Sequence, residues 1–419
     1  MISLIQHFTM ARFRRFSSRE EVNQWQQKKI SRHLKCICHH SPYYAHLKNQ
    51  PLAVFPLMNK ALMMEHLDDI NTKGLNKELL MARALTAERT RNFKDSIVDG
   101  ITVGLSSGTS GQRGLFLADK YEQQIWAGNI LAKLLPNLWQ KHRIALALRA
   151  NSPLYTTVAK GPIQFFYADL NKPYQEWIEE LDRFQPTLLV GSAQALQLCA
   201  MHSGRFSAPK ICPERIVSGA EVLTETDKNF IHQTFSCDVH EVYQCTEGFL
   251  GCTDTNAQMR WNQDIVHIEK HWLNAEKTHY SPIITDFRRR TQPIIRYQLD
   301  DVILAQEDDL PFEPIGAIAG RCGDCLTLTR LGKASFVLPD LIYRAIALAS
   351  SEQIDYRISQ REQNTICIEA NAPFYNLINE ALSELFSQLD LDPVNFLYLS
   401  VPIWHPSNKQ RRVVNQCSS

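Results

Sequence analysis

The sequence predicts an α/β protein with two domains: a large N-terminal domain of helix-covered β-sheets over residues 1–320, and a small α+β domain over residues 321–419. Strand-like apolar runs alternate with helical patterns through the middle of the chain, which is typical of a sheet covered by helices. Past Arg321 this pattern ends, and the remaining residues are expected to form a compact unit of about 100 residues, a common domain size. The total of 419 residues also exceeds what one hydrophobic core usually organises.

Two helices of the large domain are indicated by their first turns. Ser18 and Glu21 form a capping-box pattern ahead of an apolar stripe, and this helix should end before Ser41. Asp119 and Glu122 repeat the pattern. Both helices are expected to pack their apolar faces against the core.

The strands expected in the large domain lie at 144–148, 187–190, 216–217 and 239–243. Polar segments follow two of them directly, at 218–221 and 244–247. Ligands in such sheets bind beyond the carboxyl ends of the strands. These two segments are therefore candidates for a site.

The small domain should contain two helices and three strands. The helices are expected at 341–348 and 375–389, and the strands at 356–358, 365–368 and 396–401.

A loop rich in glycine and hydroxyl groups spans residues 105–114. Glycines let the backbone approach an anion closely, and consecutive N–H groups with nearby hydroxyls form a concave anion site. It is not a Walker loop, because Gly114 is followed by an apolar run that resembles a strand instead of by Lys and Ser or Thr. The pattern predicts a phosphate loop between strands, with a polar hairpin turn as the alternative.

Six segments in the same order resemble the motifs of the adenylate-forming superfamily, which contains acyl-CoA synthetases and peptide-synthetase adenylation domains. The chain is most similar to its phenylacetate-CoA ligase and F390-synthetase branch. The segments are Ser107 to Gly114, Ser218 to Glu221, Tyr243 to Gly248, Pro293 to Asp301, Gly320 to Asp324 and Asn408 to Arg412. The chain departs from the family pattern at Ser110, Gln244 and Gly323.

The resemblance implies that ATP is bound by the large domain. The phosphate loop would contribute Ser106, Ser107, Gly108, Thr109, Ser110, Gly111 and Gly114, with Arg113 near the position of a usual lysine. The adenine side would be formed by Gly219, Ala220, Glu221 and Tyr243, although Tyr243 is also compatible with an ordinary strand-end aromatic. Asp301 would accept the ribose hydroxyls, with Asp300 as a second candidate, and Arg321 would contact ribose or phosphate.

The resemblance also implies the catalytic groups. Glu247 would hold Mg²⁺, Thr246 would hydrogen-bond the α-phosphate, and Lys409 would bridge the α-phosphate and the attacking carboxylate. The small domain would swing about a hinge near Gly323 between adenylation and thiol transfer. A tail lysine such as Lys409 is otherwise read as solvated charge.

Three functions are compatible with these residues. The first is ATP-dependent activation of a small carboxylic acid with transfer to coenzyme A, and the second passes the acyl group to the phosphopantetheine thiol of an acyl carrier protein. The third is a catalytically inactive relative that serves as a binding or scaffold protein. The acid is not readable from the sequence; its pocket should be lined by parts of 146–159 and 217–249.

Composition excludes several partner classes. With 45 Lys and Arg against 44 Asp and Glu, the formal charge of +1 gives no reason to expect nucleic acid or an anionic membrane. Basic runs such as 288–290 are local. No apolar run approaches the length of a membrane span, so we expect a cytoplasmic protein, as a monomer or homodimer.

Eleven cysteines are expected to be reduced thiols in that compartment. Cys237, His240, Cys245 and Cys252 lie near one another in the sequence and form a weak zinc candidate without a second tight pair. The alternative is that these cysteines are simply buried.

Overall fold

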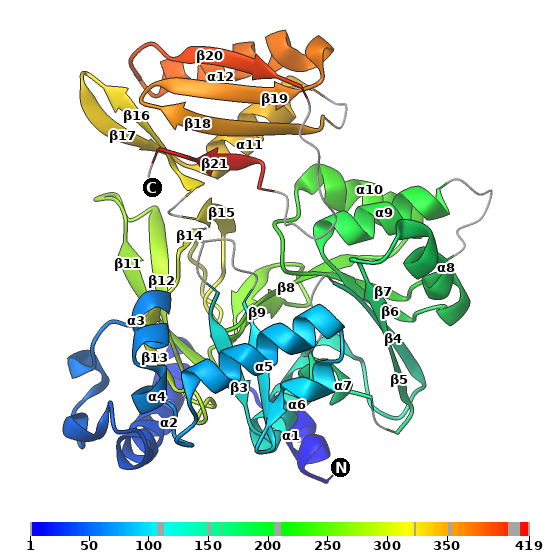
Figure 1. Ribbon diagram of the computed structural model, residues 1–419, viewed down its shortest axis with the longest axis vertical. Coiled ribbons are helices and arrows are strands. Elements are labelled where there is room, and N and C mark those ends of the chain that lie inside the picture. The colour runs from blue at the N-terminus through cyan, green and yellow to red at the C-terminus, as the bar shows by residue number, and fades with distance from the viewer. Residues whose placement is uncertain are drawn as a thin grey trace. The chain divides into compact units, whose positions relative to one another are not determined.

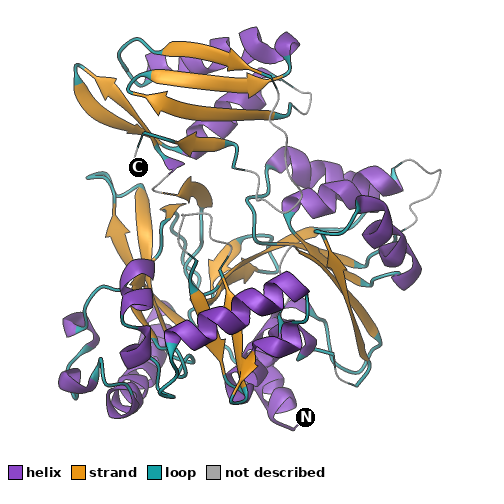
Figure 2. Ribbon diagram, viewed as in Figure 1, coloured by secondary structure: helices purple, strands orange, loops and turns teal. Residues whose placement is uncertain are grey.

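The computed structural model describes residues 2–106, 113–148, 152–159, 161–204, 211–321, 324–350, 354–400 and 411–417. The chain forms two compact units. The first comprises 1–271, 283–299 and 306–315, and the second comprises 272–282, 300–305 and 316–419. Helices and strands alternate along the chain (Figures 1 and 2), so the mixed α/β class predicted from the sequence is confirmed. In the described residues, no helix combines the length and the apolar character needed to cross a membrane.

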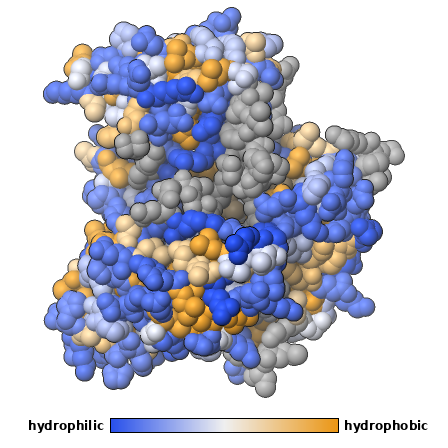
Figure 3. Space-filling model, in the orientation of Figure 1, coloured by the Kyte–Doolittle hydropathy of each residue, from blue (hydrophilic) through white to orange (hydrophobic). Residues whose placement is uncertain are grey.

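Helices in the first unit begin near the N-terminus and continue to Phe235. They are α1 (Ile2–Phe13), α2 (Arg19–His40), α3 (Lys60–Glu65), α4 (Leu67–Ile70), α5 (Lys77–Thr90), α6 (Lys120–Leu134), α7 (Pro153–Thr156), α8 (Tyr174–Phe184), α9 (Ala193–Ser203) and α10 (Glu225–Phe235). The face drawn in Figure 3 mixes hydrophilic and hydrophobic side chains.

A seven-stranded sheet forms the centre of the first unit, in the order β10-β9-β8-β7-β6-β4-β5. Its strands are β4 (His142–Leu148), β5 (Ile163–Asp169), β6 (Leu188–Gly191), β7 (Arg215–Ser218), β8 (Val239–Cys245), β9 (Gly248–Thr253) and β10 (Met259–Trp261). From β5 to β8 the strands run parallel, and β9 and β10 are antiparallel additions. The strands predicted at 144–148, 187–190, 216–217 and 239–243 correspond to β4, β6, β7 and β8.

Successive residues of the parallel strands are buried on opposite faces of this sheet. Leu189 and Ile216 belong to the core formed with α8, α9 and α10. Their neighbours Leu188 and Val217 belong to the core formed with α1 and α6. This period of two explains why the strands are apolar at consecutive positions: each face is covered by helices.

Both predicted helix starts are observed. The Ser18 hydroxyl accepts a hydrogen bond from the N–H of Glu21, 3.2 Å long, at the start of α2. Asp119 and Glu122 make the complete reciprocal capping box at the start of α6. The expected box at α2 is only half correct, because the Glu21 carboxylate accepts from the N–H and hydroxyl of Ser17.

Two further sheets precede and follow the central one. Strands β1 (Ile97–Val98), β2 (Ile101–Leu105) and β3 (Leu115–Ala118) form an antiparallel sheet. A later sheet has the order β11-β12-β14-β15, with β13 paired to β12. Its strands are β11 (Val266–Trp272), β12 (His279–Asp286), β13 (Ile294–Gln298), β14 (Asp301–Leu304) and β15 (Ala317–Arg321). The sequence analysis did not anticipate this sheet.

The C-terminal part of the second unit is a small α+β structure. Strands β18 (Tyr356–Glu362), β19 (Thr365–Ala370), β20 (Asn395–Leu399) and β21 (Val413–Asn415) form a sheet in the order β20-β19-β18-β21. Helices α11 (Pro339–Ala349) and α12 (Tyr375–Gln388) share one core with it and with the hairpin of β16 (Leu326–Arg330) and β17 (Lys333–Val337). The predicted helices and strands are found, whereas the hairpin was missed; the predicted strand end at Val401 lies outside the described residues.

We predict that Gly128→Ala destabilises the first unit. A methyl group on Gly128 of α6 would lie 2.5 Å from Cβ of His7 and 2.9 Å from the backbone nitrogen of Phe8 in α1. The gain in helix propensity is at most about 1 kcal/mol, whereas overpacking costs about 1–3 kcal/mol. The melting temperature should fall by several degrees. The half-buried Gln124→Ala on the same helix is the control, and a melting temperature at or above wild type for Gly128→Ala would contradict the packing argument.

Candidate functional site

Thr246 and Glu247 form the two-residue turn between β8 and β9. The Thr246 hydroxyl donates to Oε2 of Glu247 over 2.8 Å. A bulge next to Tyr243 shifts the strand register just before the turn, and bulges of this kind redirect side chains. The hairpin thus presents a hydroxyl and a carboxylate side by side at the end of a central strand.

Ser106 and Gly114 close the base of the predicted phosphate loop. The Ser106 N–H donates to the carbonyl of Gly114 over 2.8 Å, and the Gly114 N–H donates to the Ser106 hydroxyl over 2.7 Å. The loop connects β2 to β3, so the prediction of a loop between strands is confirmed. Its remaining predicted residues, Ser107, Gly108, Thr109, Ser110 and Gly111, lie outside the described residues.

Arg113, at the end of this loop, is directed toward α5. Its guanidinium donates to both carboxylate oxygens of Glu88, over 2.5 and 2.7 Å. Both side chains are about one third exposed, so the pair contributes little to stability. Its structural effect is to anchor the end of the loop to α5.

The buried guanidinium of Arg289 joins the β8–β9 turn to β3. It donates to the carbonyls of Thr246 and Leu117, each over 3.0 Å, and to the side-chain oxygen of Gln292 over 3.2 Å. Gln292 in turn donates to the carbonyl of Leu115 over 2.9 Å. Because a buried charge is tolerated only when it is hydrogen-bonded, these bonds fix the two strands and the Arg289 segment as one body.

Lys60 reaches the same place from the N-terminal part of the chain. The preceding Met58 forms a bridge to β13, with its N–H donating to the carbonyl of Arg296 and its carbonyl accepting from the N–H of Gln298. Asn59 then caps α3 by accepting from the N–H of Leu62 over 2.9 Å. Lys60 is therefore the first residue of a helix whose start is attached to a strand.

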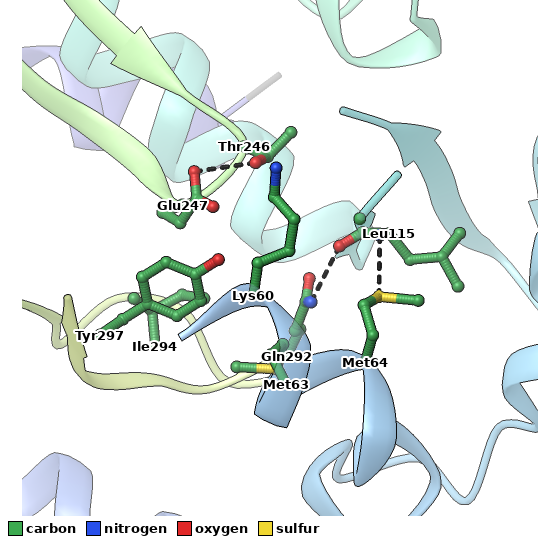
Figure 4. Close-up of a pocket in the computed structure, with 10 residues that line it drawn as sticks. Lys60, Met63, Met64, Leu115, Thr246, Glu247, Gln292, Ile294 and Tyr297 are labelled. Atoms are coloured by element: carbon green, nitrogen blue, oxygen red, sulfur yellow. Dashed lines mark hydrogen bonds between the residues drawn. The ribbon is translucent and has the colours of Figure 1, made fainter. Parts of the chain in front are cut away.

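These elements enclose a first pocket with about 270 Å³ of space free of atoms. It is lined by Lys60, Met63, Met64, Gly114, Leu115, Thr246, Glu247, Gln292, Ile294 and Tyr297. In Figure 4 the Lys60 side chain rises from α3 toward Thr246 and Glu247. The pocket combines an ammonium, a carboxylate, hydroxyls and the base of a glycine-rich loop, which are groups suited to a polyphosphate with a divalent cation.

A second pocket, with about 550 Å³ of space free of atoms, adjoins the same turn. It is lined by Phe116, Ala118, Glu122, Ile125, Trp126, Asn129, Leu154, Gln244, Cys245, Gly248, Phe249, Ile265, Asp286, Arg288 and Arg289. The residues of the turn itself line the first pocket, whereas the flanking Cys245 and Gly248 line the second. The acid pocket was predicted to be lined by parts of 146–159 and 217–249, and the walls contributed by β3, α6 and 286–289 were not predicted.

Asp286 is the titratable group most affected by this environment. It is 5% exposed, and burial raises its pKa to about 6 despite the nearby Arg289. A methyl group on Gly248 would lie 3.0 Å from its carboxylate, so glycine at that position permits the close approach of the β8–β9 turn.

The residues predicted for the adenine side follow β7. Gly219 must be glycine, since a methyl group there would lie 2.9 Å from the Val242 side chain of β8. Ala220 has a left-handed backbone, with φ at 66°, and Glu221 accepts from the N–H of Gln194 at the start of α9 over 3.3 Å. Tyr243 is 7% exposed and packs on Trp261. None of these four residues lines either pocket.

The remaining predicted residues belong to the second unit. Asp301 and Arg321 are cross-strand partners on β14 and β15, and Nε of Arg321 lies 3.6 Å from the Asp301 carboxylate. Asp300 is exposed. Lys409 and Gly323 lie outside the described residues. Nearby, Arg411 forms an ion pair with Asp324.

The weak zinc candidate receives no support from the geometry. Among the described residues, no group of three or more His, Cys, Asp or Glu side chains gathers as a metal site. Cys252 contacts Asn262 and Cys245 contacts the carbonyl of Gly248. These cysteines therefore take part in the packing of the β8–β9 hairpin.

No family model matches the chain. Protein CapK from Staphylococcus aureus is 23% identical over 376 residues, 86% of this chain and 79% of CapK. Among solved structures, 2-hydroxyisobutyryl-CoA ligase in the postadenylation state with R3-HIB-AMP has a TM-score of 0.68 at 14% identity, covering 94% of this chain and 89% of the ligase. The anthranilate CoA ligase AuaEII with anthranoyl-AMP has a TM-score of 0.52 at 11% identity, covering 74% of this chain and 65% of that ligase.

The chain has the adenylate-forming enzyme fold. The likeness extends over both compact units, so the fold expected from the six sequence segments is confirmed. At these identities it shows the fold alone.

Several pocket residues of this adenylate-forming fold were missed by sequence reasoning. Lys60 lies in a short helix without a motif, and only the asparagine cap at Asn59 marks its start. Arg289 was read as part of a local basic run, yet it is 7% exposed. The apolar residues at 293–295, which follow the run after Thr291 and Gln292, were the available signal that the segment enters the core.

We predict a pH dependence of stability from Asp286. Its pKa rises from 3.8 to about 6 on folding, so between these values the folded state binds more protons than the unfolded state. Stability should therefore fall as pH rises through this window, by about 3 kcal/mol in total for a shift of about two units. The free energy of unfolding, measured with urea from about pH 4 to about pH 7, should fall with pH in wild type and should not show this fall in Asp286→Asn. The exposed Asp309→Asn should keep it, and identical slopes in all three proteins would contradict the assignment.

Proposed function

We propose that the protein activates a carboxylic acid with ATP as an acyl-adenylate and then transfers the acyl group to a thiol, with coenzyme A as the expected acceptor. The observation that carries the proposal is the first pocket, where Lys60, Thr246 and Glu247 meet the base of a glycine-rich loop. The fold, shared with solved acid-CoA ligases, supports the same chemistry.

The two pockets beside the β8–β9 turn supply places for both reactants. The first pocket would receive the triphosphate beside Lys60, Thr246 and Glu247. The second pocket, walled largely by aromatic and aliphatic side chains, would receive the organic part of the acid. The reacting carboxylate and the α-phosphate would then meet at the turn. Holding two reactants in this way removes much of the entropic part of the barrier.

Attack of a carboxylate on the α-phosphorus brings two anions together. A carboxylate oxygen forms a bond to phosphorus while the bond to pyrophosphate breaks, and negative charge moves to the departing group. Lys60 would neutralise that charge, and the Thr246 hydroxyl would turn from Glu247 to donate to a phosphate oxygen. In the second half-reaction the thiol sulfur attacks the acyl carbon and AMP leaves.

The residues of the first pocket also fit Mg²⁺. Mg²⁺ is usually bound by one or two carboxylates together with substrate phosphates, and Glu247 supplies one carboxylate beside the Thr246 hydroxyl. When bound, the cation would offset phosphate charge.

Other assignments in this proposal come from the sequence resemblance. They are the phosphate-loop residues, Asp301 on ribose, Arg321 on ribose or phosphate, Gly219, Ala220, Glu221 and Tyr243 on the adenine side, and Lys409 as the lysine that bridges carboxylate and α-phosphate. We also propose that the small domain at 321–419 is mobile. The protein is proposed to be cytoplasmic, as a monomer or homodimer. A carrier-protein phosphopantetheine remains the alternative acceptor, and an inactive binding relative the alternative class.

Glu247→Gln should weaken binding of Mg·ATP. Losing a charged ligand costs about 1.5–3 kcal/mol, which is about 10- to 150-fold in affinity. Isothermal titration with ATP in the presence and absence of Mg²⁺ measures this without knowledge of the acid. Glu241→Gln on the same hairpin is the control. Failure of wild type to bind ATP would refute the proposed function, and equal affinity in Glu247→Gln would show that Glu247 is structural.

Lys60→Met should lower ATP affinity by roughly 10- to 100-fold, because it removes the ammonium that faces the triphosphate. Lys77→Met is a matched control: Lys77 is also the first residue of a helix capped by asparagine, but it lines neither pocket. Titration with ATP, followed by acid-dependent pyrophosphate exchange, should separate the two variants. If they bind ATP alike, the first pocket is not the triphosphate site.

A further inference from the structure

The second pocket contains a guanidinium at a position that adenylation chemistry does not require. Arg288 and Arg289 both line the pocket, but they face different surroundings. Arg289 bonds Thr246 and Leu117 at the turn. Arg288 instead interacts electrostatically with Arg14, Asp264, Asp286 and Tyr121. The Arg288 guanidinium thus has different partners from the guanidinium that holds the turn.

One side-chain donor of Arg288 is left without a hydrogen-bond acceptor. Its Nε is buried and has no partner among the residues that the structure describes. Burial, together with repulsion from Arg14, lowers its pKa. A buried donor left without a partner costs free energy that an incoming acceptor recovers. An acceptor on a ligand in this pocket would form the hydrogen bond that Nε of Arg288 lacks.

The surrounding charges favour an anion over a neutral acceptor. Asp264 is already engaged by two cations, at 3.1 Å from Arg14 and 3.3 Å from Lys133. Arg288 is therefore a third positive charge around one carboxylate. Arg288 also interacts with Asp286, which lies beside Arg289 and is partly protonated near neutral pH because its pKa is about 6.

Asn129 adds a second unsatisfied atom. It is 2% exposed, and its amide nitrogen donates to the carbonyl of Ile125 over 2.7 Å, which fixes the orientation of the amide. Its side-chain oxygen has no partner in the described part of the chain. A hydroxyl group on a ligand would donate a hydrogen bond to this oxygen. A neutral ligand with a hydroxyl group is therefore the alternative to an anionic ligand.

We propose that the second pocket selects acids with a second carboxylate, held by Arg288 at the end of an apolar or aromatic frame remote from the carboxylate that is activated. This inference rests on the proposed function, which it deepens by naming the substrate class. The apolar walls, including Phe116, Trp126 and Phe249, would contact the frame.

The test measures acid binding directly, by isothermal titration with and without a non-hydrolysable ATP analogue. The probes are phenylacetate, 4-hydroxyphenylacetate and 4-carboxyphenylacetate, together with the aliphatic pair hexanoate and adipate. Wild type should bind at least one diacid about tenfold or more tightly than its monoacid partner. The affinity for 4-hydroxyphenylacetate should lie between the affinities for phenylacetate and 4-carboxyphenylacetate.

Two variants identify the group responsible. Arg288→Met keeps the length of the side chain without the charge and should abolish the preference, whereas Arg288→Lys should restore part of it. Arg290→Met, in the same basic run but exposed, should bind all probes as wild type does. Circular dichroism of each variant establishes folding, and the comparison among probes in wild type needs no variant.

The inference would be overturned if wild type binds neither diacid more tightly than its monoacid, if the hydroxy acid binds most tightly, or if the preference survives in Arg288→Met. Pyrophosphate exchange with monoacids alone would likewise overturn it and leave the proposed function intact. Failure to bind ATP would refute the proposed function, whatever the result of acid binding without nucleotide.

Discussion

The candidate site depends on one buried cation. Arg289 reaches the β8–β9 turn, strand β3 and Gln292 with hydrogen bonds of 3.0–3.2 Å, and its guanidinium lies 4.8 Å from the centre of the Phe116 ring. Burying a charge is costly unless donors are matched to acceptors. The carbonyls that satisfy Arg289 belong to segments far apart in the sequence, so none of them can shift without exposing an unpaired charge.

This constraint explains how a motif of two residues becomes a site. Thr246 and Glu247 sit on a turn that could take several orientations, but the Thr246 carbonyl is held by Arg289. Gly248 allows the turn to approach Asp286 closely. On the other side, the bridge from Met58 to β13 brings in Lys60. The local sequence supplies the Thr246 hydroxyl and the Glu247 carboxylate, and distant segments of the chain hold these groups in place.

Much of the fold could be predicted because its signals are local. The period-two burial of β4, β6 and β7 and the caps at Ser18 and Asp119 are visible within a few residues. The β16–β17 hairpin and the sheet around β12 were missed, since the pairing of their strands is set by tertiary contacts. In the site, Thr246, Glu247 and Gly114 were found by motif. Lys60 and Arg289 were not, because their roles arise from long-range contacts that leave no spacing in the sequence.

The two-residue turn also separates two sets of positions that natural selection can alter independently. The first pocket draws on α3 and residues 292–297, and the second on α6 and residues 286–289; both use β3 and the β8–β9 hairpin. Substitutions on the α6 wall can therefore change the shape and polarity of the second pocket while the first pocket stays as it is. Proteins built on this hairpin could alter one pocket without altering the other.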